Sequence, residues 1–535
     1  MKKPGLIHRS GRGAAGFLIL AAALLTAALL TMGCSSCEKH DTEGAFVVLL
    51  DTSPRGLDPR FSTSDGSAKL VGLLHAGLIS TDTQDGTVEL RLAKSIEQTS
   101  PIRYEVELRD DAFFHDGVPV TTRDVEYTFM KLGDELVKSP FAGLTRRIET
   151  FEVVDEQRFV ITLVEPHAPF ITDMSMGIVP RHICDGFKEC PGDPVGAGPF
   201  RYVRHEGDLY YEFAAFDKYF EGKPNIERLV FRVLRDDNAR LLALLGNTAD
   251  VVQNAVAPLM LPVVDRNDRL IQETAPSFKY TYLAFNLEHP ILSDLRVRKA
   301  IAHAIDRESI IKYKFHETAR LSTGMLTPEH WAYEGNVATY DFDLEKAKKL
   351  LDEAGYPEVD GVRFELEFKV SASKFRRSMA ELIGQQLGLI GIEVRVRSFE
   401  WGTFFHDIRS RNFAMTTLQW PSVLEPSLYR WIFHSSNIPS PDNRAAGANR
   451  GAYSNARVDE LLEAGDRETN LEKRKAIYGE VQQILAEELP YVSLWHEDNI
   501  AILRQGIKGY YTTPNARFES LKEAHPAPRA QPGGK

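Results

Sequence analysis

One stretch of this 535-residue chain is apolar for long enough to cross a membrane, and it stands at the very beginning. Lys2, Lys3, Arg9 and Arg12 come first without any acid, and the apolar run follows over residues 13–33. A basic segment followed by an apolar one is typical of an export signal. The run is as long as a membrane span, so its length alone leaves open both a cleaved signal and a retained anchor. No later apolar stretch approaches roughly 18 residues, so no further span is expected.

The residues at the end of the run favour cleavage and lipidation. Leu30-Thr31-Met32-Gly33-Cys34 resembles the bacterial lipoprotein processing box, in which the cysteine is diacylated and becomes the new N-terminus. Thr31 departs from the usual aliphatic residue, and a buried cysteine at the end of a membrane helix is the weaker alternative. Acyl chains contribute about 0.8 kcal/mol per buried CH₂. We therefore expect a signal over 1–33, a lipid anchor on Cys34 and a tether over 34–44.

Composition excludes several classes of protein. Removing residues 1–33 takes away four positive charges and no negative one, which moves the formal net charge from −11 to −15. This acidic balance argues against nucleic acid as a partner, because phosphate binding needs a basic surface. A hydrophobic content of 43% is that of a packed globular protein, not of a disordered or fibrous one. The length exceeds the roughly 250–300 residues at which one core stops growing, so at least two lobes are expected.

The cysteines predict a disulfide and no metal site. An export signal implies an oxidising compartment, where disulfides persist. Cys184 and Cys190 bracket a short segment and are the natural pair, since no His stands near them at zinc spacing. Cys37 is left in the tether, where it forms a C-x-x-C pattern with Cys34 outside any strand–helix unit. We expect neither metal nor cofactor.

Short apolar patterns predict a mixed α/β fold. Residues 45–50 form a continuous apolar run typical of a strand buried on both faces, and residues 104–109 alternate like a half-buried strand. A helix is expected to begin with a cap at 122–124. Residues 364–396 indicate a strand, a helix and a second strand. The chain's end, over 521–535, contains a Pro-, Gly- and Ala-rich stretch and is expected to be disordered.

Nothing in the sequence supports an enzyme. The chain has no nucleophile elbow, no H-E-x-x-H, no P-loop and no G-x-G-x-x-G motif. Gly196-Ala197-Gly198 lacks a third glycine and precedes a proline, so a turn is the better interpretation. His75 and His115 stand among apolar or turn residues and are expected to be structural.

Several short segments, taken in chain order, carry a likeness to one family. They are Leu57-Asp58-Pro59, the run Leu108 to Thr121 followed by Asp124-Val125, Gly196 to Phe200, Lys218 to Pro224, Arg296 to Asp306, Tyr453-Ser454-Asn455 and Pro490-Tyr491-Val492. In this order they resemble the peptide/nickel-type (dipeptide/oligopeptide) extracellular substrate-binding proteins of ABC transporters. The likeness covers nearly all of the mature chain, from about Val47 to Tyr511.

The resemblance implies an α/β, two-lobed periplasmic-binding-protein-like (type II) fold with an extra subdomain in the first lobe. We expect a first lobe over 45–275 with the inserted subdomain at about 93–190, a second lobe over 276–495 and a return to the first lobe over 496–520. The resemblance also implies a monomer that encloses a solute as the lobes close and presents it to a membrane permease driven by a separate ATPase. The expected location is the periplasmic or cell-surface face of a bacterial membrane.

One segment departs from the family pattern where ligand is bound. Peptide-binding members carry a Trp-x-x-Asp segment whose carboxylate pairs with the peptide α-ammonium. Here Trp420 is kept, Val423 stands where that Asp would be, and Glu425 precedes a proline as the family's more distal acid does. A buried ammonium without a carboxylate is costly. Either peptides with a free N-terminus bind poorly, or Glu425 substitutes for the missing acid.

Four residues besides Glu425 are candidates for the ligand site. Trp401 and Trp420 are candidates to stack on a ligand, although a buried Trp is more often part of a core. Arg450 is a candidate for a ligand carboxylate, with a solvated surface arginine as the alternative. Ser53 follows the first strand, where family members approach the ligand backbone.

The leading hypothesis is a lipid-anchored receptor of an ABC importer that binds a peptide or peptide-like solute. A sensory or chaperone-like solute-binding lipoprotein without a transport role is the alternative, and an exported hydrolase is a remote third. A neighbouring permease and ATPase gene would separate the first two.

Overall fold

The structure is a computed structural model that describes residues 42–84, 86–440 and 447–528. The predicted signal, Cys34 and Cys37 lie outside the described residues. Ala45–Lys535 form one compact unit. Within the described part, no helix is both long enough and apolar enough to cross a membrane.

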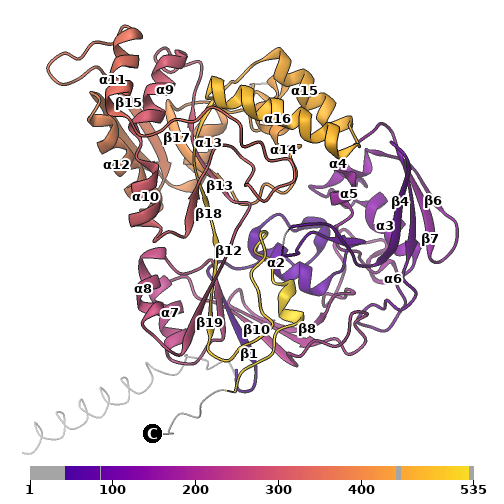
Figure 1. The fold of residues 1–535 in the computed structure, drawn as a ribbon. Coiled ribbons are helices and arrows are strands. Elements are labelled where there is room, and N and C mark those ends of the chain that lie inside the picture. Colours follow the sequence, from indigo (N-terminus) through magenta and orange to yellow (C-terminus); the bar gives the residue numbers. More distant parts are fainter. Residues whose placement is uncertain (1–41, 85, 441–446, 529–535) are drawn as a thin grey trace, which may run out of the picture. The chain divides into compact units, whose positions relative to one another are not determined.

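A seven-stranded sheet is built from segments far apart in the sequence, in the order β12-β19-β11-β1-β10-β9-β8 (Figure 1). Its strands are β1 (Phe46–Leu50), β8 (Phe200–Glu206), β9 (Tyr210–Ala215), β10 (Arg228–Val233), β11 (Val251–Gln253), β12 (Leu270–Ala275) and β19 (Asn499–Arg504). β1 lies inside this sheet, parallel to both β10 and β11. All five of its residues are buried, as its continuous apolar run predicts.

A four-stranded antiparallel sheet follows within residues 93–163, in the order β4-β5-β7-β6. Its strands are β4 (Ala93–Ser100), β5 (Arg103–Leu108), β6 (Ile148–Val153) and β7 (Arg158–Leu163), and the short pair β2 (Ile79–Ser80) and β3 (Glu89–Leu90) precedes it. Burial alternates along β5, in agreement with its sequence pattern. The helix after it, α3 (Thr122–Lys131), begins one residue earlier than expected. Its cap is Thr121, which forms a capping box with Asp124.

A six-stranded sheet is formed by the second half of the chain, in the order β14-β18-β13-β17-β15-β16. Its strands are β13 (Tyr280–Phe285), β14 (Ala319–Leu321), β15 (Phe364–Ser371), β16 (Ile392–Phe399), β17 (Met415–Trp420) and β18 (Tyr491–Glu497). β15 and β16 are parallel, and the helix α12 (Lys374–Gly388) connects them. This confirms the predicted strand–helix–strand unit.

The other α-helices pack around these sheets or on one another, as α11 does on α9 and α15 on α16 (Figure 1). They are α2 (Asp65–Leu74), α4 (Ala142–Thr145), α5 (Phe170–Asp173), α6 (Arg181–Cys184), α7 (Asp237–Leu245), α8 (Leu261–Asp265), α9 (Leu295–Ala304), α10 (Arg307–Lys314), α11 (Leu344–Glu353), α13 (Trp401–Arg409), α14 (Leu428–Phe433), α15 (Ala456–Arg467) and α16 (Leu471–Glu488). Short 3₁₀ turns occur at η1 (Pro59–Phe61), η2 (Pro258–Met260), η3 (Ser435–Asn437) and η4 (Glu519–Lys522).

The glycines of the Gly196-Ala197-Gly198 turn allow a close approach to α2. A Cβ atom at either glycine would collide with the backbone carbonyls of Leu73 or Leu74. The His115 ring holds the same turn, because its Nδ1 accepts from the Gly196 N–H at 3.2 Å while Nε2 lies 3.1 Å from the Gly198 carbonyl. Burial lowers the pKa of His115 to about 4, so the ring is neutral. Both the turn and this histidine are structural, as predicted.

The C-terminal segment differs from the expected disordered tail over 521–535 in its first part. Leu521 and Ala524 are fully buried in the core beside the seven-stranded sheet. Arg504 also donates hydrogen bonds to the carbonyls of Ala527 and Pro528. The Pro- and Ala-containing composition of this segment suggested a free tail, but its apolar side chains pack into the core. The rest of the predicted tail, 529–535, lies outside the described residues.

Candidate functional site

Two adjoining cavities form a cleft within the Ala45–Lys535 unit. The larger has a volume of about 840 Å³ and the smaller about 480 Å³. Both fall in the range of small-ligand sites, roughly 300–1,000 Å³. They share six lining residues, which are Phe141, Leu144, Thr172, Asp173, Ser422 and Leu424. We call residues 140–173, from the region of the four-stranded sheet, the first wall, and residues 422–437 with Asp466 the second wall.

The second wall begins at the end of β17, directly after Trp420. Val423 points into the core and is 1% exposed, and its N–H donates to the Phe278 carbonyl at 2.9 Å. The position at which the family resemblance predicts an acid is therefore an apolar core position here. Glu425 does line the larger cavity, but its carboxylate is ion-paired with the buried guanidinium of Arg474 from α16.

The charges of the second wall are compensated on the protein. Arg474 also donates to the Gly465 carbonyl at 2.9 Å, and its side chain is only 6% exposed. Arg430 lies 3.1 Å from Asp466, the other acid of this wall. Burial raises the pKa of both Glu425 and Asp466, while the neighbouring guanidinium groups oppose that shift.

The first wall holds a row of three polar side chains, Arg147, His167 and Asp173. Arg147 Nη1 donates to His167 Nδ1 at 2.7 Å, and His167 Nε2 lies 3.8 Å from the Asp173 carboxylate. Burial and the positive charge of Arg147 lower the pKa of His167 to about 3, so the ring is neutral. Burial raises the pKa of Asp173 to about 7. Within the described ranges, no lysine or arginine nitrogen lies within 4.0 Å of the Asp173 carboxylate.

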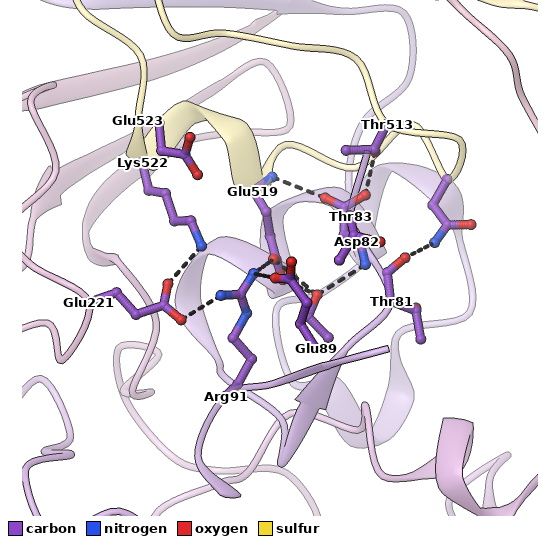
Figure 2. Close-up of polar contacts among 12 residues, drawn as sticks. Thr81, Asp82, Thr83, Glu89, Arg91, Glu221, Thr513, Glu519, Lys522 and Glu523 are labelled. Atoms are coloured by element: carbon purple, nitrogen blue, oxygen red, sulfur yellow. Dashed lines mark hydrogen bonds and ion pairs between the residues drawn. The ribbon is translucent and has the colours of Figure 1, made fainter. Parts of the chain in front are cut away.

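The smaller cavity has charged side chains that already contact partners on the protein (Figure 2). Arg91 lies 3.0 Å from Glu519 and also contacts Glu221. Lys522 reaches Glu221 at 2.7 Å. Asp82 accepts the backbone N–H of Glu519 at 3.2 Å, and burial together with the Glu519 carboxylate raises the pKa of Asp82. These contacts connect the C-terminal segment to the segments that follow β2, β3 and β9.

Three hydrogen bonds bridge the cleft. Ser422 Oγ donates to Asn515 Oδ1 at 2.9 Å, and Asn515 Nδ2 donates to the Thr81 carbonyl at 2.7 Å. On the other side, the Ala168 N–H donates to the Asp466 carbonyl at 2.8 Å. The second wall is thus connected to both the C-terminal segment and the first wall.

Three of the sequence candidates meet in one stack beside the cleft. The Arg450 guanidinium lies 4.9 Å from the Phe405 ring centroid and 5.8 Å from that of Trp420, and Trp401 stacks on Phe405 at 5.4 Å. Trp401, Trp420 and Arg450 do not line either cavity. The stack reaches the cleft through Trp431, whose ring centroid is 5.5 Å from that of Trp420 and which does line the larger cavity.

The other candidates are placed as follows. Glu425 lines the larger cavity, and Ser53 does not line either one. Cys184 and Cys190 are joined by a disulfide. In the described part of the chain, no group of three or more His, Cys, Asp and Glu side chains is arranged to hold a metal ion.

The first wall was not singled out by the sequence reasoning. Arg147, His167 and Asp173 belong to no motif. They come together because β6 and β7 pair antiparallel, which brings Arg147 before β6 back to the segment after β7, where the Val164 N–H donates to the Arg147 carbonyl at 2.9 Å. The one local signal is a histidine within Pro166-His167-Ala168-Pro169, between a strand and a short helix.

The cleft has the volume of a small-solute site, and a family model points to the same kind of protein. The model of the bacterial extracellular solute-binding proteins, family 5 Middle, matches residues 87–440, about two thirds of the chain. This chain belongs to that family. The match confirms the resemblance stated from the sequence, and the family's members are solute-binding proteins rather than enzymes.

Individual members of family 5 match this chain over almost its full length. The oligopeptide-binding protein AppA of Bacillus subtilis is 25% identical over 541 residues, covering 95% of this chain and 98% of AppA. The solved structure of that AppA with a nonapeptide has a TM-score of 0.75 at 24% identity, covering 90% of this chain and 99% of that one. NikZ of Campylobacter jejuni, solved with Ni(L-His), gives 0.77 at 24% identity with the same coverage. These neighbours confirm the type II periplasmic-binding-protein fold.

Proposed function

We propose that the chain is the substrate-binding protein of an ABC importer, that it captures a peptide or peptide-like solute between two lobes, and that it delivers the solute to a membrane permease. The observation that carries the proposal is the pair of adjoining cavities, whose walls come from different sheets and are bridged by a few hydrogen bonds. Such a cleft suits capture by hinge closure. A relative named for oligopeptides supports the solute class.

The lobes in this proposal follow the predicted boundaries. The first lobe, over 45–275 and 496–520, would contain the seven-stranded sheet and the inserted subdomain at about 93–190. The second lobe, over 276–495, would contain the six-stranded sheet. The chain passes between the two sheets after β12 and after β18, and Ser277 Oγ donates to the Glu497 carbonyl where the two crossings meet. These crossings would serve as the hinge of a monomer.

The lipid anchor on Cys34 is part of the proposal. Two acyl chains together hold a protein stably at a membrane, whereas one does so only marginally. Cells fed an alkyne-tagged palmitate should label the wild-type protein and leave a Cys34→Ala variant unlabelled. Equal labelling of both proteins would remove the anchor from the proposal.

The solute class has a direct test. Native mass spectrometry of the protein purified from its own source should show bound species with peptide masses, released on denaturation. A retained solute that contains no amide would contradict the peptide class. Loss of uptake of the same solute on deletion of the gene, restored by the wild-type protein, would separate transport from a sensory or chaperone-like role.

A further inference from the structure

A solute with an ammonium group needs an acid in the cleft, and the second wall does not offer a free one. Val423 is apolar and faces the core. Glu425 and Asp466 are each paired with a guanidinium group, from Arg474 and Arg430. An ammonium that approached either acid would have to compete with a partner already in place. The two hypotheses from the sequence, poor binding of free N-termini or substitution by Glu425, therefore leave out the opposite wall.

Asp173, on the first wall, is a carboxylate in the cleft without a guanidinium or ammonium partner among the described residues. It lines both cavities, and its side chain is 32% exposed, so its carboxylate is accessible from the cleft. The basic side chain nearest to its carboxylate among the described residues is His167, which is neutral and lies 3.8 Å away, beyond hydrogen-bonding distance. α5 has only four residues and ends at Asp173, and within the described residues no backbone N–H donates to the Asp173 carboxylate. A carboxylate enclosed in this way gains most from a cationic partner.

We propose that Asp173 binds the ammonium group of the solute, a peptide N-terminus, from the first wall of the cleft. This assignment rests on the proposed function, because it takes the solute to be a peptide. It moves the recognition of the ammonium group from the segment after Trp420 to the segment before Met174. His167 separates Asp173 from Arg147, so the row presents a negative and a positive group to the solute without neutralising either.

The charges around Asp173 determine how binding depends on pH. Arg147 on the first wall favours the ionised carboxylate, and Glu425 across the cleft disfavours it. The other ionisable groups near it are Tyr104 on β5, whose pKa is raised by burial and by the Asp173 charge, and His167, which is neutral above about pH 3. The Arg430–Asp466 pair lines the same cavity. Binding of an ammonium requires Asp173 to be ionised. Affinity should therefore fall as the pH drops below about 7, because the carboxyl must then first lose its proton.

The experiment uses the full mature protein and a pool of random di- to pentapeptides. Native mass spectrometry identifies the peptides that are retained, and calorimetry measures the best of them with wild type, Asp173→Asn and Asp110→Asn. Asp110 is an exposed acid after β5 and serves as the matched control. We expect Asp173→Asn to weaken binding at least about tenfold, since a hydrogen bond to a charged group is lost, and the control to bind like wild type.

Two further measurements separate binding from a structural role. N-acetylation of the peptide should weaken binding to wild type about tenfold. It should change binding to Asp173→Asn by less than about threefold, because this variant has already lost the contact that acetylation removes. Wild-type affinity should fall about tenfold from pH 7.5 to pH 5.5, whereas the Asp173→Asn variant should show no such fall.

The outcomes distinguish the two levels of the proposal. If wild type retains no peptide from the pool, the proposed solute class is wrong, and the assignment of Asp173 fails with it. If peptides bind but Asp173→Asn binds them within threefold of wild type, or N-acetylation has no effect on wild type, the assignment is overturned and the proposed function stands.

Discussion

Glu425 and Asp466 on the second wall of the cleft each have a guanidinium partner, whereas Asp173 on the first wall has a neutral histidine 3.8 Å away. All three carboxylates face the same cavity and all three have a raised pKa. The difference is what opposes the burial of the charge. On the second wall the protein supplies the counter-charge itself, which stabilises the fold. On the first wall the counter-charge is left to a partner from solution, which favours binding.

The largest expected effect comes from breaking the second wall. Arg474→Leu removes the guanidinium and leaves Glu425 enclosed without a partner. Removing one member of a buried ion pair costs about 3–5 kcal/mol of unfolding free energy. Urea unfolding of the purified variant measures this loss. Arg457→Leu is the control, because the Arg457–Glu480 pair is exposed and such pairs contribute about 0–1 kcal/mol. Equal losses in both variants would show that the second wall is no better compensated than the surface.

Removing the acid of the first wall should raise the unfolding free energy instead of lowering it. The pKa of Asp173 is raised to about 7 in the folded protein, so its ionisation destabilises the fold as the pH rises from about 4 to about 7. Asp173→Asn should therefore increase the unfolding free energy of the empty protein at pH 8 by about 2 kcal/mol, after allowance for its partial exposure. At pH 4 the gain should vanish. Thermal unfolding at the two pH values, without added solute, measures the difference, and a destabilised variant at pH 8 would contradict it.

The bridge between the walls should contribute less. Asn515→Ala removes both the hydrogen bond from Ser422 and the one to the Thr81 carbonyl. A net loss of about 1 kcal/mol per hydrogen bond is the ordinary value. We expect a several-fold weaker solute affinity measured by calorimetry. A Gln272→Ala variant, altered on β12 away from the cavities, should keep wild-type affinity.

The smallest effect is expected for Trp401. Its side chain is 55% exposed and stacks on Phe405 outside both cavities. Trp401→Ala should change solute affinity by less than about twofold and stability by about 0.5 kcal/mol. Trp431→Ala is the comparison, because that ring lines the larger cavity and its loss should weaken solute affinity more than the loss of Trp401 does. Equal losses of affinity in the two variants would indicate that Trp401 contacts the solute as Trp431 does.

Much of the fold could be predicted from the sequence, because its signals are local. The apolar run of β1, the alternation along β5 and the strand–helix–strand unit from β15 to β16 each reflect the burial of one short segment. The C-terminal segment around Leu521 could not be predicted in the same way. Its burial depends on contacts with residues far away in the chain, such as Phe46 and Phe231, and composition alone does not encode those contacts.

The site was less predictable than the fold. The sequence drew attention to the segment after Trp420, and the structure explains why that segment offers no free acid: Val423 packs in the core and Arg474 occupies Glu425. The partner of Glu425 comes from a helix about 50 residues later, so no local pattern announces it. Likewise Arg147 and Asp173 become neighbours only through the pairing of β6 and β7.

The place of β19 in the seven-stranded sheet has a consequence for synthesis. This strand lies between β11 and β12, yet it comes near the end of the chain, whereas β1 comes near the beginning. The sheet that contains β1 therefore stays incomplete until almost the whole polypeptide has left the ribosome. Contacts between such distant segments form slowly. A sheet that closes this late suits a member of an extracellular family, because an unfolded chain is easier to export than a folded one.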